Sequence, residues 1–555
     1  MERLWIRIRR NLSRLPLEVL VYVSMVVALA AVAIGVYLSP PSSSGSFTIL
    51  QINDLYKVEG LERGSVGGLA RVRTLRAALE KEKKPVLTLH AGDFLYPSVA
   101  SKYLKARQMI RCMNLLDGKP GEFDDRMVVT FGNHEFDDDS RDLLAARILE
   151  SDFHWVASTL RFRWDEEAPF EAPSKKLGNV KDDLVLDLGG VKVGILGVTL
   201  EDEKLPWVEY RYADPAQRYQ VIGEALQRLQ EKGAQVLIAL THQGIEQDIE
   251  LARKFPQIHL IVGGHDHTYI HRPEGKTLIT KADADARSVW TIDVEVLGDG
   301  RVVAVPRRIE LGFATARDGG MMKAVNKSRQ DLEAVYLATR GNKMTDKLGS
   351  SETLLEGVET AIRERETAMG NYLADAIRQE MKTQVTLLNA GSVRINDNIP
   401  AGQITWEDLE GIAYFDNTLV SFSLSPEQIL SLLQSSVSKI GQADGGFLQV
   451  SGLRFRYHID RSADGLAYKV DWGDVRICPK SDGCTESELK ALEPGGGAIT
   501  VSALNYLCEN ISKGESSVKC SANGPTWREV VEGALRNGGK PIAPKVEGRI
   551  TRVDS

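Results

Sequence analysis

The sequence predicts two α/β domains joined by a helix and preceded by a transmembrane helix. From Phe47 to Leu311, short β-rich runs alternate with helical stretches such as Leu69 to Lys81 and Pro215 to Lys232, which is typical of a layered α/β domain. A polar, helix-favouring segment follows at Met321 to Lys347, and a new mixed pattern begins at Leu348. A chain of 555 residues is long enough to bury two ordinary cores.

An uncharged apolar run at residues 19–38 predicts a single transmembrane helix. At ~1.5 Å per helical residue, this run spans the ~30 Å hydrocarbon core of a bilayer. Arginines are frequent in residues 1–18 and a Ser/Pro-rich linker follows at 39–46, so we expect a cytosolic N-terminus and a periplasmic or extracellular body. A cleaved signal peptide is the competing interpretation, although its apolar region is usually only ~7–15 residues long. The arginines before the run are Arg3, Arg7, Arg9, Arg10 and Arg14.

Charge and cysteine content restrict the partners and the compartment. Lys and Arg number 69 and Asp and Glu 76, and the net charge of -7 gives no reason to expect nucleic acid as a partner. Cys478 lies close to Cys484, and Cys508 to Cys520, whereas Cys112 is alone. In an oxidising compartment these neighbours predict two local disulfides, although other pairings are possible and a zinc knuckle is the rival interpretation.

Polar side chains follow five of the β-rich runs in the first domain. Each has an ordinary explanation, because Asp and Asn often cap helices or form turns and a buried His is often only packed. In an open α/β sheet, however, ligands bind beyond the carboxyl ends of the strands, so five such ends together indicate a site. The runs and the residues that follow them are FTIL with Asn53 and Asp54, VLTLH with Gly92 and Asp93, MVVTF with Asn133, His134 and Glu135, VLIALT with His242, and IHLIV with His265, Asp266 and His267.

The side chains at these strand ends are typical ligands of metal ions. Carboxylate, carboxamide and imidazole groups suit manganese, zinc, iron or magnesium, and one carboxylate can bridge two ions. Two divalent ions ~3.5–4 Å apart bind a phosphate oxygen, lower the pKa of a shared water and direct the hydroxide in line with the leaving group. The pattern therefore predicts hydrolysis of phosphate esters.

The same residues resemble the calcineurin-like metallophosphoesterases, and within these the 5′-nucleotidases, for which an Asn-His-Glu-Phe-Asp stretch like residues 133–137 is the more specific mark. The resemblance implies a layered metallophosphoesterase sandwich over residues 47–312 and two divalent ions as cofactors. It also implies that His134, oriented by Asp137, stabilises the transition-state phosphate and assists the leaving oxygen. The implied ligands are Asp54, Asp93 and His267 for the first ion, and Asp93, Asn133, His242 and His265 for the second.

The C-terminal part resembles the substrate domain of the 5′-nucleotidases, with a connecting helix at 313–347 and a mixed α/β substrate-binding domain at 348–555. In that family the domain clamps a base between two aromatic rings, with arginines near phosphate or ribose oxygens. The alternative is that the rings belong to the core and the arginines are solvated. The stretches that carry the resemblance are RETAMGN, NAGSVR, YFDN and GFLQVSG, and the matching substrate positions are Arg363, Asn389, Arg394, Phe415 and Tyr506.

Two positions depart from the family pattern. Where the family has a glycine-rich turn with an aspartate, this chain has the segment from Cys508 to Cys520. Where the family has a histidine for the first ion, this chain has Tyr56. Residues i and i+2 of an extended segment point the same way, so we expect Tyr56 to face the ions if Asp54 does. The phenol either ionises and binds as a hard oxygen ligand that favours ferric iron, or merely lines the site while water completes the first ion. We expect the second arrangement, with the first ion bound more weakly than the second.

These observations predict a membrane-anchored di-metal phosphohydrolase that cleaves phosphate esters of nucleotides outside the cytosol. One alternative is the same hydrolysis of a non-nucleotide phosphate or sulfur ester. A second is a surface-anchored binding protein whose metal site has decayed, although the intact pair His134 and Asp137 argues against decay.

Overall fold

The computed structural model describes residues 43–553, except 202–204, 211–214, 461–466, 482–483, 516 and 522–523. The predicted basic segment at 1–18 and the predicted transmembrane helix at 19–38 lie outside the described residues. Within the part of the chain that the structure describes, no helix combines the length and the apolar character needed to cross a bilayer.

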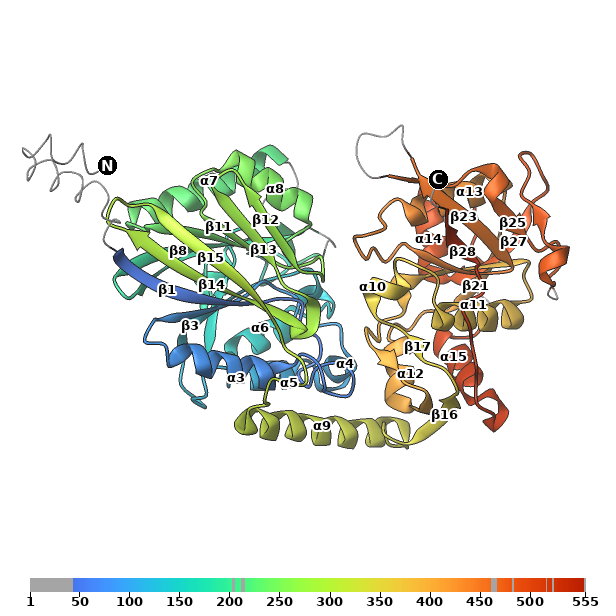
Figure 1. Ribbon diagram of the computed structural model, residues 1–555, viewed down its shortest axis with the longest axis horizontal. Helices are drawn as coiled ribbons and strands as arrows, with labels where there is room; N and C mark the ends of the chain where they lie inside the picture. The colour runs from blue at the N-terminus through green and yellow to red at the C-terminus, as the bar shows by residue number, and fades with distance from the viewer. Residues whose placement is uncertain are drawn as a thin grey trace, which may run out of the picture.

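The first domain is a sandwich of two packed β-sheets (Figure 1). The first sheet has the order β15 (Val302–Glu310), β14 (Ser288–Leu297), β1 (Ser43–Ile52), β2 (Val86–His90), β3 (Asp124–Thr130), β4 (Phe153–Val156) and β6 (Val180–Lys181). The second has the order β12 (Ile270–Glu274), β13 (Thr277–Lys281), β11 (Leu260–Gly263), β10 (Val236–His242), β8 (Val191–Thr199) and β7 (Asp183–Leu188). In the first sheet β15 and β14 pair antiparallel, and the strands from β1 to β6 are parallel. In the second sheet the edge strands β12 and β7 pair antiparallel with their neighbours, and the strands between them are parallel.

Apolar side chains from both sheets meet in the interior of the sandwich. Phe47 and Leu89 of the first sheet pack in one cluster with Ile195 and Ile238 of the second, and all four are fully buried. Helices cover the outer faces, so the central strands are buried on both sides and read as continuous apolar runs. The helices are α3 (Leu69–Glu80), α4 (Val99–Leu104), α5 (Arg107–Met113) and α6 (Arg141–Leu149) on the first sheet, and α7 (Pro215–Glu231) and α8 (Ile245–Lys254) on the second.

The five strand ends with polar side chains are divided between the two sheets. Strands β1, β2 and β3 belong to the first sheet, and β10 and β11 to the second. The layered sandwich implied by the family resemblance is therefore confirmed, because the apolar inner faces of two sheets are buried against each other. The ends still converge, since the parallel strands of both sheets finish at the same edge of the sandwich.

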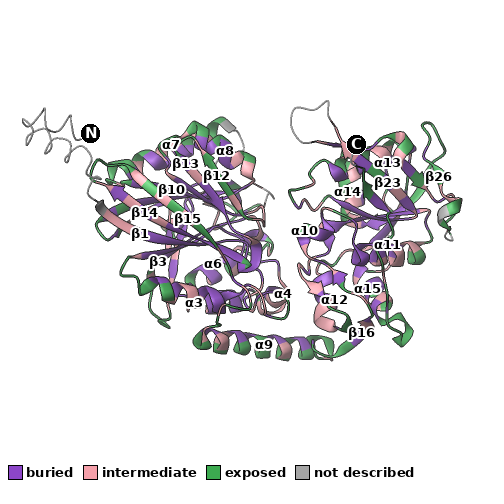
Figure 2. Cartoon of the chain, viewed as in Figure 1, coloured by how far each residue is buried: buried purple, intermediate pink, exposed green. Residues whose placement is uncertain are grey.

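The helix α9 (Gly319–Arg340) connects the two domains along one side of the molecule (Figure 1). Asp318 caps its first turn by accepting a hydrogen bond of 2.8 Å from the backbone of Met321, and Gly341, with φ 79°, ends it. Much of the helix is exposed (Figure 2), but Leu332 and Tyr336 are buried in a small apolar cluster shared by both domains.

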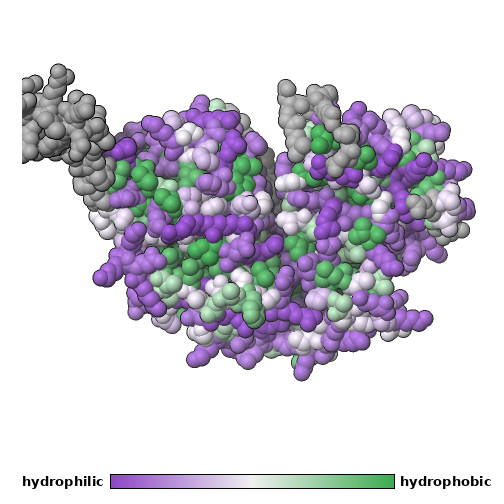
Figure 3. Space-filling view, in the orientation of Figure 1, coloured by the Kyte–Doolittle hydropathy of each residue, from purple (hydrophilic) through white to green (hydrophobic). Residues whose placement is uncertain are grey.

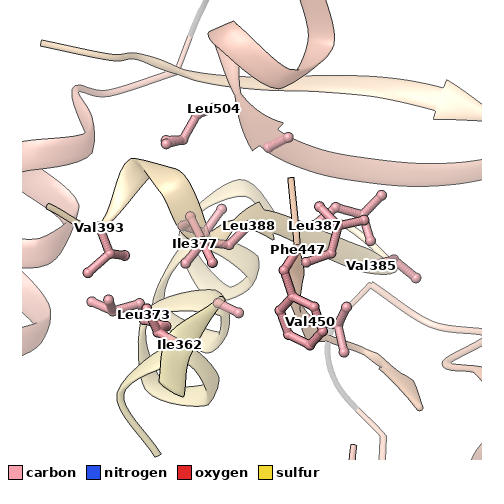
Figure 4. Packing of buried hydrophobic residues seen from close by; sticks show 14 of the residues in the cluster. Ile362, Leu373, Ile377, Val385, Leu387, Leu388, Val393, Phe447, Val450 and Leu504 are labelled. Atoms are coloured by element: carbon pink, nitrogen blue, oxygen red, sulfur yellow. The ribbon is translucent and has the colours of Figure 1, made fainter. Parts of the chain in front are cut away.

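The second domain is built on a mixed sheet whose core is shown in Figure 4. Leu373 and Ile377 of α11 pack against Leu387 of the sheet. The sheet has the order β21 (Leu419–Leu424), β27 (Ile499–Leu504), β18 (Val385–Asn389) and β22 (Leu448–Ser451). A smaller sheet contains β24 (Tyr468–Lys469), β23 (Leu453–Ile459), β25 (Val475–Ile477), β26 (Lys490–Ala491) and β28 (Ile550–Arg552). Around them lie β17 (Leu355–Glu356), α10 (Glu359–Ile362), α11 (Ala368–Met381), α12 (Trp406–Ile412), α13 (Pro426–Val437), α14 (Asn505–Gly514) and α15 (Trp527–Arg536).

Two disulfides lie in the second domain, and both have the predicted pairing. Cys478 is bonded to Cys484 and Cys508 to Cys520, whereas Cys112 is a buried free thiol in the first domain. The face of the molecule in Figure 3 is mainly hydrophilic, with small scattered apolar areas, as the mean hydropathy of -0.20 indicates.

Candidate active site

The predicted metal ligands converge where the strand ends of the two sheets meet. Asp54 follows β1, Asp93 follows β2 and His242 ends β10. All three are buried, and each offers a ligand atom within 4.8 Å of the other two. Nε2 of His242 lies 3.0 Å from Oδ2 of Asp93 and 3.9 Å from Oδ1 of Asp54. These distances suit carboxylates and an imidazole that share one bound cation.

Left-handed backbone conformations turn the ligand side chains into the site. Asp54, Asp93, His265 and His267 have φ values of 49°, 58°, 79° and 56°. Non-glycine residues adopt this region at a cost, and such strain is concentrated at functional sites. The sequence predicted an extended segment through Asp54, but β1 ends at Ile52 and Asp54 lies beyond it.

Glycines allow the strand ends to approach one another closely. A Cβ atom on Gly132 would lie 2.1 Å from Oδ1 of Asp93, and one on Gly264 would lie 2.4 Å from the carbonyl oxygen of Ala91. Any larger residue at either position would displace the backbone or the ligand.

The residues expected to bind the second ion are held within the first domain. Nδ1 of His242 is 2.7 Å from the carbonyl oxygen of Ala91, which leaves Nε2 directed at Asp93. This buried Nε2 contacts only the carboxylates of Asp93 and Asp54 among the described residues, as expected of an atom that binds a metal beside them. The ring of His265 packs at 73° to that of His242, with centroids 5.3 Å apart. Asn133 precedes His134, whose backbone donates to Oδ1 of Asp93 at 2.8 Å.

Electrostatics distinguish the two histidines of this group. Burial alone would lower the pKa of His242, but the carboxylates of Asp93 and Asp54 raise it to about 9. Burial lowers the pKa of His265 to about 3, helped by the charge of His242. The two buried carboxylates thus create a negative site that favours a cation, while His265 offers a neutral nitrogen. This donor set fits a divalent metal ion.

The residues expected to bind the first ion surround the hydroxyl of Tyr56. The Oη atom lies 2.9 Å from Nε2 of His267 and donates to Oδ2 of Asp93 at 3.3 Å and to Oδ1 of Asp54 at 3.5 Å. Burial, Asp93 and Asp54 hold the pKa of Tyr56 well above its usual range. Burial would lower the pKa of His267, but Glu359 and Asp54 raise it to about 10. Tyr56 therefore faces the site, as predicted, although not for the predicted backbone reason.

His134 lies beside this group and joins the two domains. Its Nδ1 is 2.9 Å from each carboxylate oxygen of Asp137, and its Nε2 is 4.0 Å from Oδ2 of Asp93. The same Nε2 is 3.4 Å from Nη2 of Arg394, which belongs to the second domain. Burial would lower the pKa of His134, but Asp137 and Asp93 raise it. The geometry matches a histidine that is oriented from one side and exposes Nε2 to a substrate.

The other predicted substrate residues lie on the second domain at different distances from His134. The guanidinium carbon of Arg394 is 5.8 Å from the centre of the Phe415 ring, so these two are brought together. Arg363 is bonded to Glu359, and Oδ1 of Asn389 accepts a hydrogen bond of 2.9 Å from Ser392. The rings of Phe415 and Tyr506 are 36% and 56% exposed, and the pairing of Leu419 with Leu504 places both at the same end of the β21–β27 ladder.

Three acidic residues near the ligands have roles that the sequence did not predict. Glu135 accepts hydrogen bonds from the backbone amides of Gly132, Asp93, Phe94 and Leu95, and its position in the Asn-His-Glu-Phe-Asp stretch is the only signal. Asp285 accepts from the amides of Tyr56 and Lys57 at 2.8 and 2.9 Å. Glu359 reaches His267 from the second domain. For Asp285 and Glu359 no sequence pattern marks the contact.

Comparisons with known proteins agree with this fold and site. The family profile described as calcineurin-like phosphoesterase matches residues 47–269, and that of the 5′-nucleotidase C-terminal domain matches residues 347–480. The 5′-nucleotidase of Bos taurus is 26% identical over 489 residues, which cover 80% of this chain and 81% of that protein.

Two solved structures share the fold at lower identity. The 5′-nucleotidase precursor from Thermus thermophilus has a TM-score of 0.72 and 24% identity, over 92% of this chain and 99% of that one. The sulfate thiohydrolase SoxB of Thermus thermophilus has a TM-score of 0.63 and 17% identity, over 93% and 98% of the two chains. Residues 47–269 therefore match a calcineurin-like phosphoesterase domain and residues 347–480 a 5′-nucleotidase C-terminal domain, and the chain is a metal-dependent phosphoester hydrolase.

Proposed function

We propose that this protein hydrolyses phosphate esters of nucleotides, as a 5′-nucleotidase does, with two divalent ions. The observation that carries the proposal is the position of Arg394. Its guanidinium contacts His134 of the first domain and lies 5.8 Å from the exposed ring of Phe415. A planar base can stack on such a ring while a guanidinium binds phosphate or ribose oxygens, so one substrate can occupy both contacts.

The residues that would hold the ions are those that the family resemblance implies, and the close approach of Asp54, Asp93 and His242 supports them. Asp54, Asp93 and His267 would hold the first ion, and Asp93 would be shared with a second ion. The remaining ligands of the second ion would be Asn133, His242 and His265. When bound, the two ions supply the Lewis acid and the activated water that ester hydrolysis requires. Their identity among manganese, zinc, iron and magnesium is not assigned.

Proton transfer is assigned to His134. Asp137 fixes the ring through Nδ1, so Nε2 faces Arg394, where, with a substrate bound, it would stabilise negative charge on the phosphate and give a proton to the leaving oxygen. Arg394 adds a positive charge on the same side. On the second domain, Arg363 and Asn389 would bind polar groups of the substrate, and Phe415 with Tyr506 would hold the base between two rings.

We also propose that the body of the protein lies outside the cytosol. The support is the apolar run at 19–38 with the basic segment before it, together with two disulfides in the second domain. Disulfides persist in oxidising compartments and are rare in the cytosol. The alternative of a decayed site gains no support, because the ligands, the His134–Asp137 pair and Arg394 converge.

Substitutions at Asp93 and Phe415 test the proposed reaction in the full-length protein. Asp93→Asn should lower kcat/KM for a nucleoside 5′-monophosphate by about 1,000-fold, since both ions lose a charged ligand. Phe415→Ala should raise KM for that substrate about fivefold, because a stacked ring contributes about 1 kcal/mol, but should leave hydrolysis of ribose 5-phosphate within about twofold. Steady-state kinetics with added Mn²⁺ gives both values.

The control for Phe415 is Phe313→Ala, since the Phe313 ring is 92% exposed. It should leave KM for both substrates unchanged. Equal losses for the nucleotide and for ribose 5-phosphate in Phe415→Ala would contradict the base clamp, and full activity of Asp93→Asn would contradict the metal assignment.

A further inference from the structure

Glu359 of the second domain is bonded to His267, a residue assigned to the first ion. Glu359 begins α10 and is 3% exposed. Its Oε2 bonds Nδ1 of His267, while Nε2 of the same ring lies 3.3 Å from Oδ1 of Asp54 and 2.9 Å from Oη of Tyr56. One nitrogen of the ring is thus held by the second domain, and the other faces the ligands of the first.

The second carboxylate oxygen of Glu359 contacts the arginines assigned to the substrate. Oε1 bonds Nη2 of Arg363 and lies 3.7 Å from Nη1 of Arg394. A buried carboxylate is stable only while its charged partners remain in place, and losing one partner is costly. Glu359 therefore links a metal histidine in one domain to the substrate-binding arginines in the other.

The contacts around Glu359 are polar and do not fill the space between the domains. Nδ2 of Asn396 donates to Oδ2 of Asp285 at 3.2 Å, and Lys57 pairs with Asp397 at 3.3 Å. A cavity of about 550 Å³ lies between the domains and is lined in part by Glu359. Polar interfaces between domains commonly allow the domains to move relative to each other.

We propose that Glu359 is a positioning residue for the first metal site, so that ion binding there depends on contact between the two domains. The inference rests on the two-ion assignment of the proposed function. With Nδ1 held by Glu359, the His267 ring directs Nε2 at the first ion, and such partners of metal-binding histidines commonly govern affinity. When the domains separate, the ring loses this partner and the first ion is held more weakly. His242 keeps its partner Ala91 within the first domain, so the second ion is unaffected.

Titration of metal-depleted, full-length protein with Mn²⁺ alone tests this dependence without any substrate. The concentration of free Mn²⁺, measured by electron paramagnetic resonance during the titration, should reveal two classes of binding site in the wild-type protein. Glu359→Ala should weaken the lower-affinity site by about 10–100-fold and leave the other within about threefold. Glu359→Gln removes the same charge but keeps an acceptor oxygen for Nδ1, so it should lose less than about tenfold.

The comparison of the two variants separates positioning from a loss of charge. The matched control is Glu356→Gln, because Glu356 lies on the same segment and pairs with Arg365. This variant should bind both ions as the wild-type protein does. Unchanged affinities in Glu359→Ala, equal losses in Glu359→Ala and Glu359→Gln, or a single class of site in the wild type would each overturn the inference.

Hydrogen exchange tests the coupling in the reverse direction. Mn²⁺ should slow backbone exchange in α10 of the wild-type protein by at least about tenfold and leave α10 of Glu359→Ala unchanged, because binding at one site must stabilise the contact on which it depends. No change in α10 of the wild type would overturn the coupling. If the protein shows these effects but does not cleave nucleotides, only the proposed substrate is contradicted. If the protein cleaves nucleotides and Glu359→Ala binds both ions as tightly as the wild type does, only this inference is contradicted.

Discussion

At the scale of single residues, Tyr56 decides how the first ion is held. Its hydroxyl lies within 3.5 Å of an atom from each of Asp54, Asp93 and His267, so the phenol is placed among the ligands. A neutral phenol is a poor ligand, and burial beside two carboxylates makes its ionisation unfavourable in the absence of a cation. We therefore expect the ring to line the site while water completes the first ion.

Substitution of Tyr56 distinguishes this arrangement from a bound phenolate. Tyr56→Phe should leave kcat within about threefold of wild type, because no ligand is lost. Tyr56→His should tighten the weaker Mn²⁺ site about tenfold, since a neutral imidazole is a better ligand than a phenol. A strong visible charge-transfer band in the iron-loaded wild type that vanishes in Tyr56→Phe would show instead that the phenolate binds the metal.

At the scale of elements, the loops after the strands depend on one buried acid. Glu135 lies in the short helix η1 (His134–Phe136) and accepts hydrogen bonds from four backbone amides of the loops after β2 and β3. These bonds fix Asp93 in its left-handed conformation, at φ 58°, beside Gly132. The geometry of Asp93, the proposed bridging ligand, is thus set by the side chain of Glu135.

Replacing Glu135 should loosen this connection between the loops. Glu135→Gln presents an NH₂ group to some of the four amides, so buried donors lose their acceptor and the free energy of unfolding should fall by about 2–3 kcal/mol. Thermal or urea unfolding measures the loss, and Mn²⁺ affinity should fall with it because Asp93 is displaced. Glu122→Gln, at a residue whose side chain is 68% exposed, should change neither quantity. A stable Glu135→Gln protein with normal ion affinity would contradict this role.

At the scale of the whole molecule, the active site is completed by the contact between the domains. Arg394 reaches His134, Glu359 reaches His267, and Nζ of Lys102 donates to the carbonyl oxygen of Tyr414 at 2.7 Å. The helix α9 holds the domains together along one side and shares a small apolar cluster with both. The proposed sites for substrate and ions therefore lie where the two domains contact each other.

The proposed location outside the cytosol concerns the whole chain and has a direct test. Protease added to intact cells or spheroplasts should degrade the body after residue 46 and leave the basic N-terminal segment protected, because the arginines favour a cytosolic N-terminus. Immunoblotting of both ends measures the outcome. If the body survives until the cytosolic membrane is broken, the proposed orientation is wrong.

The sequence predicted the strands and the polar residues that follow them because both leave local patterns. The run VLTLH coincides with β2, since a parallel strand buried on both faces must be apolar throughout. The division of the strand ends between two sheets left no such pattern, because it depends on which apolar faces meet. The contact of Glu359 with His267 joins positions 92 residues apart, and no spacing in the sequence encodes it.

The proposed ligands come from both sheets, and this has a consequence for the stability of the folded protein. Asp54 and Asp93 extend from one sheet and His242 from the other, so a bound cation fastens two layers that are otherwise held by apolar packing. An ion that binds only the folded form stabilises it by about 1.4 kcal/mol for each tenfold rise in its concentration above the dissociation constant. The supply of metal in the surroundings should therefore raise the free energy of unfolding of the enzyme as well as its activity.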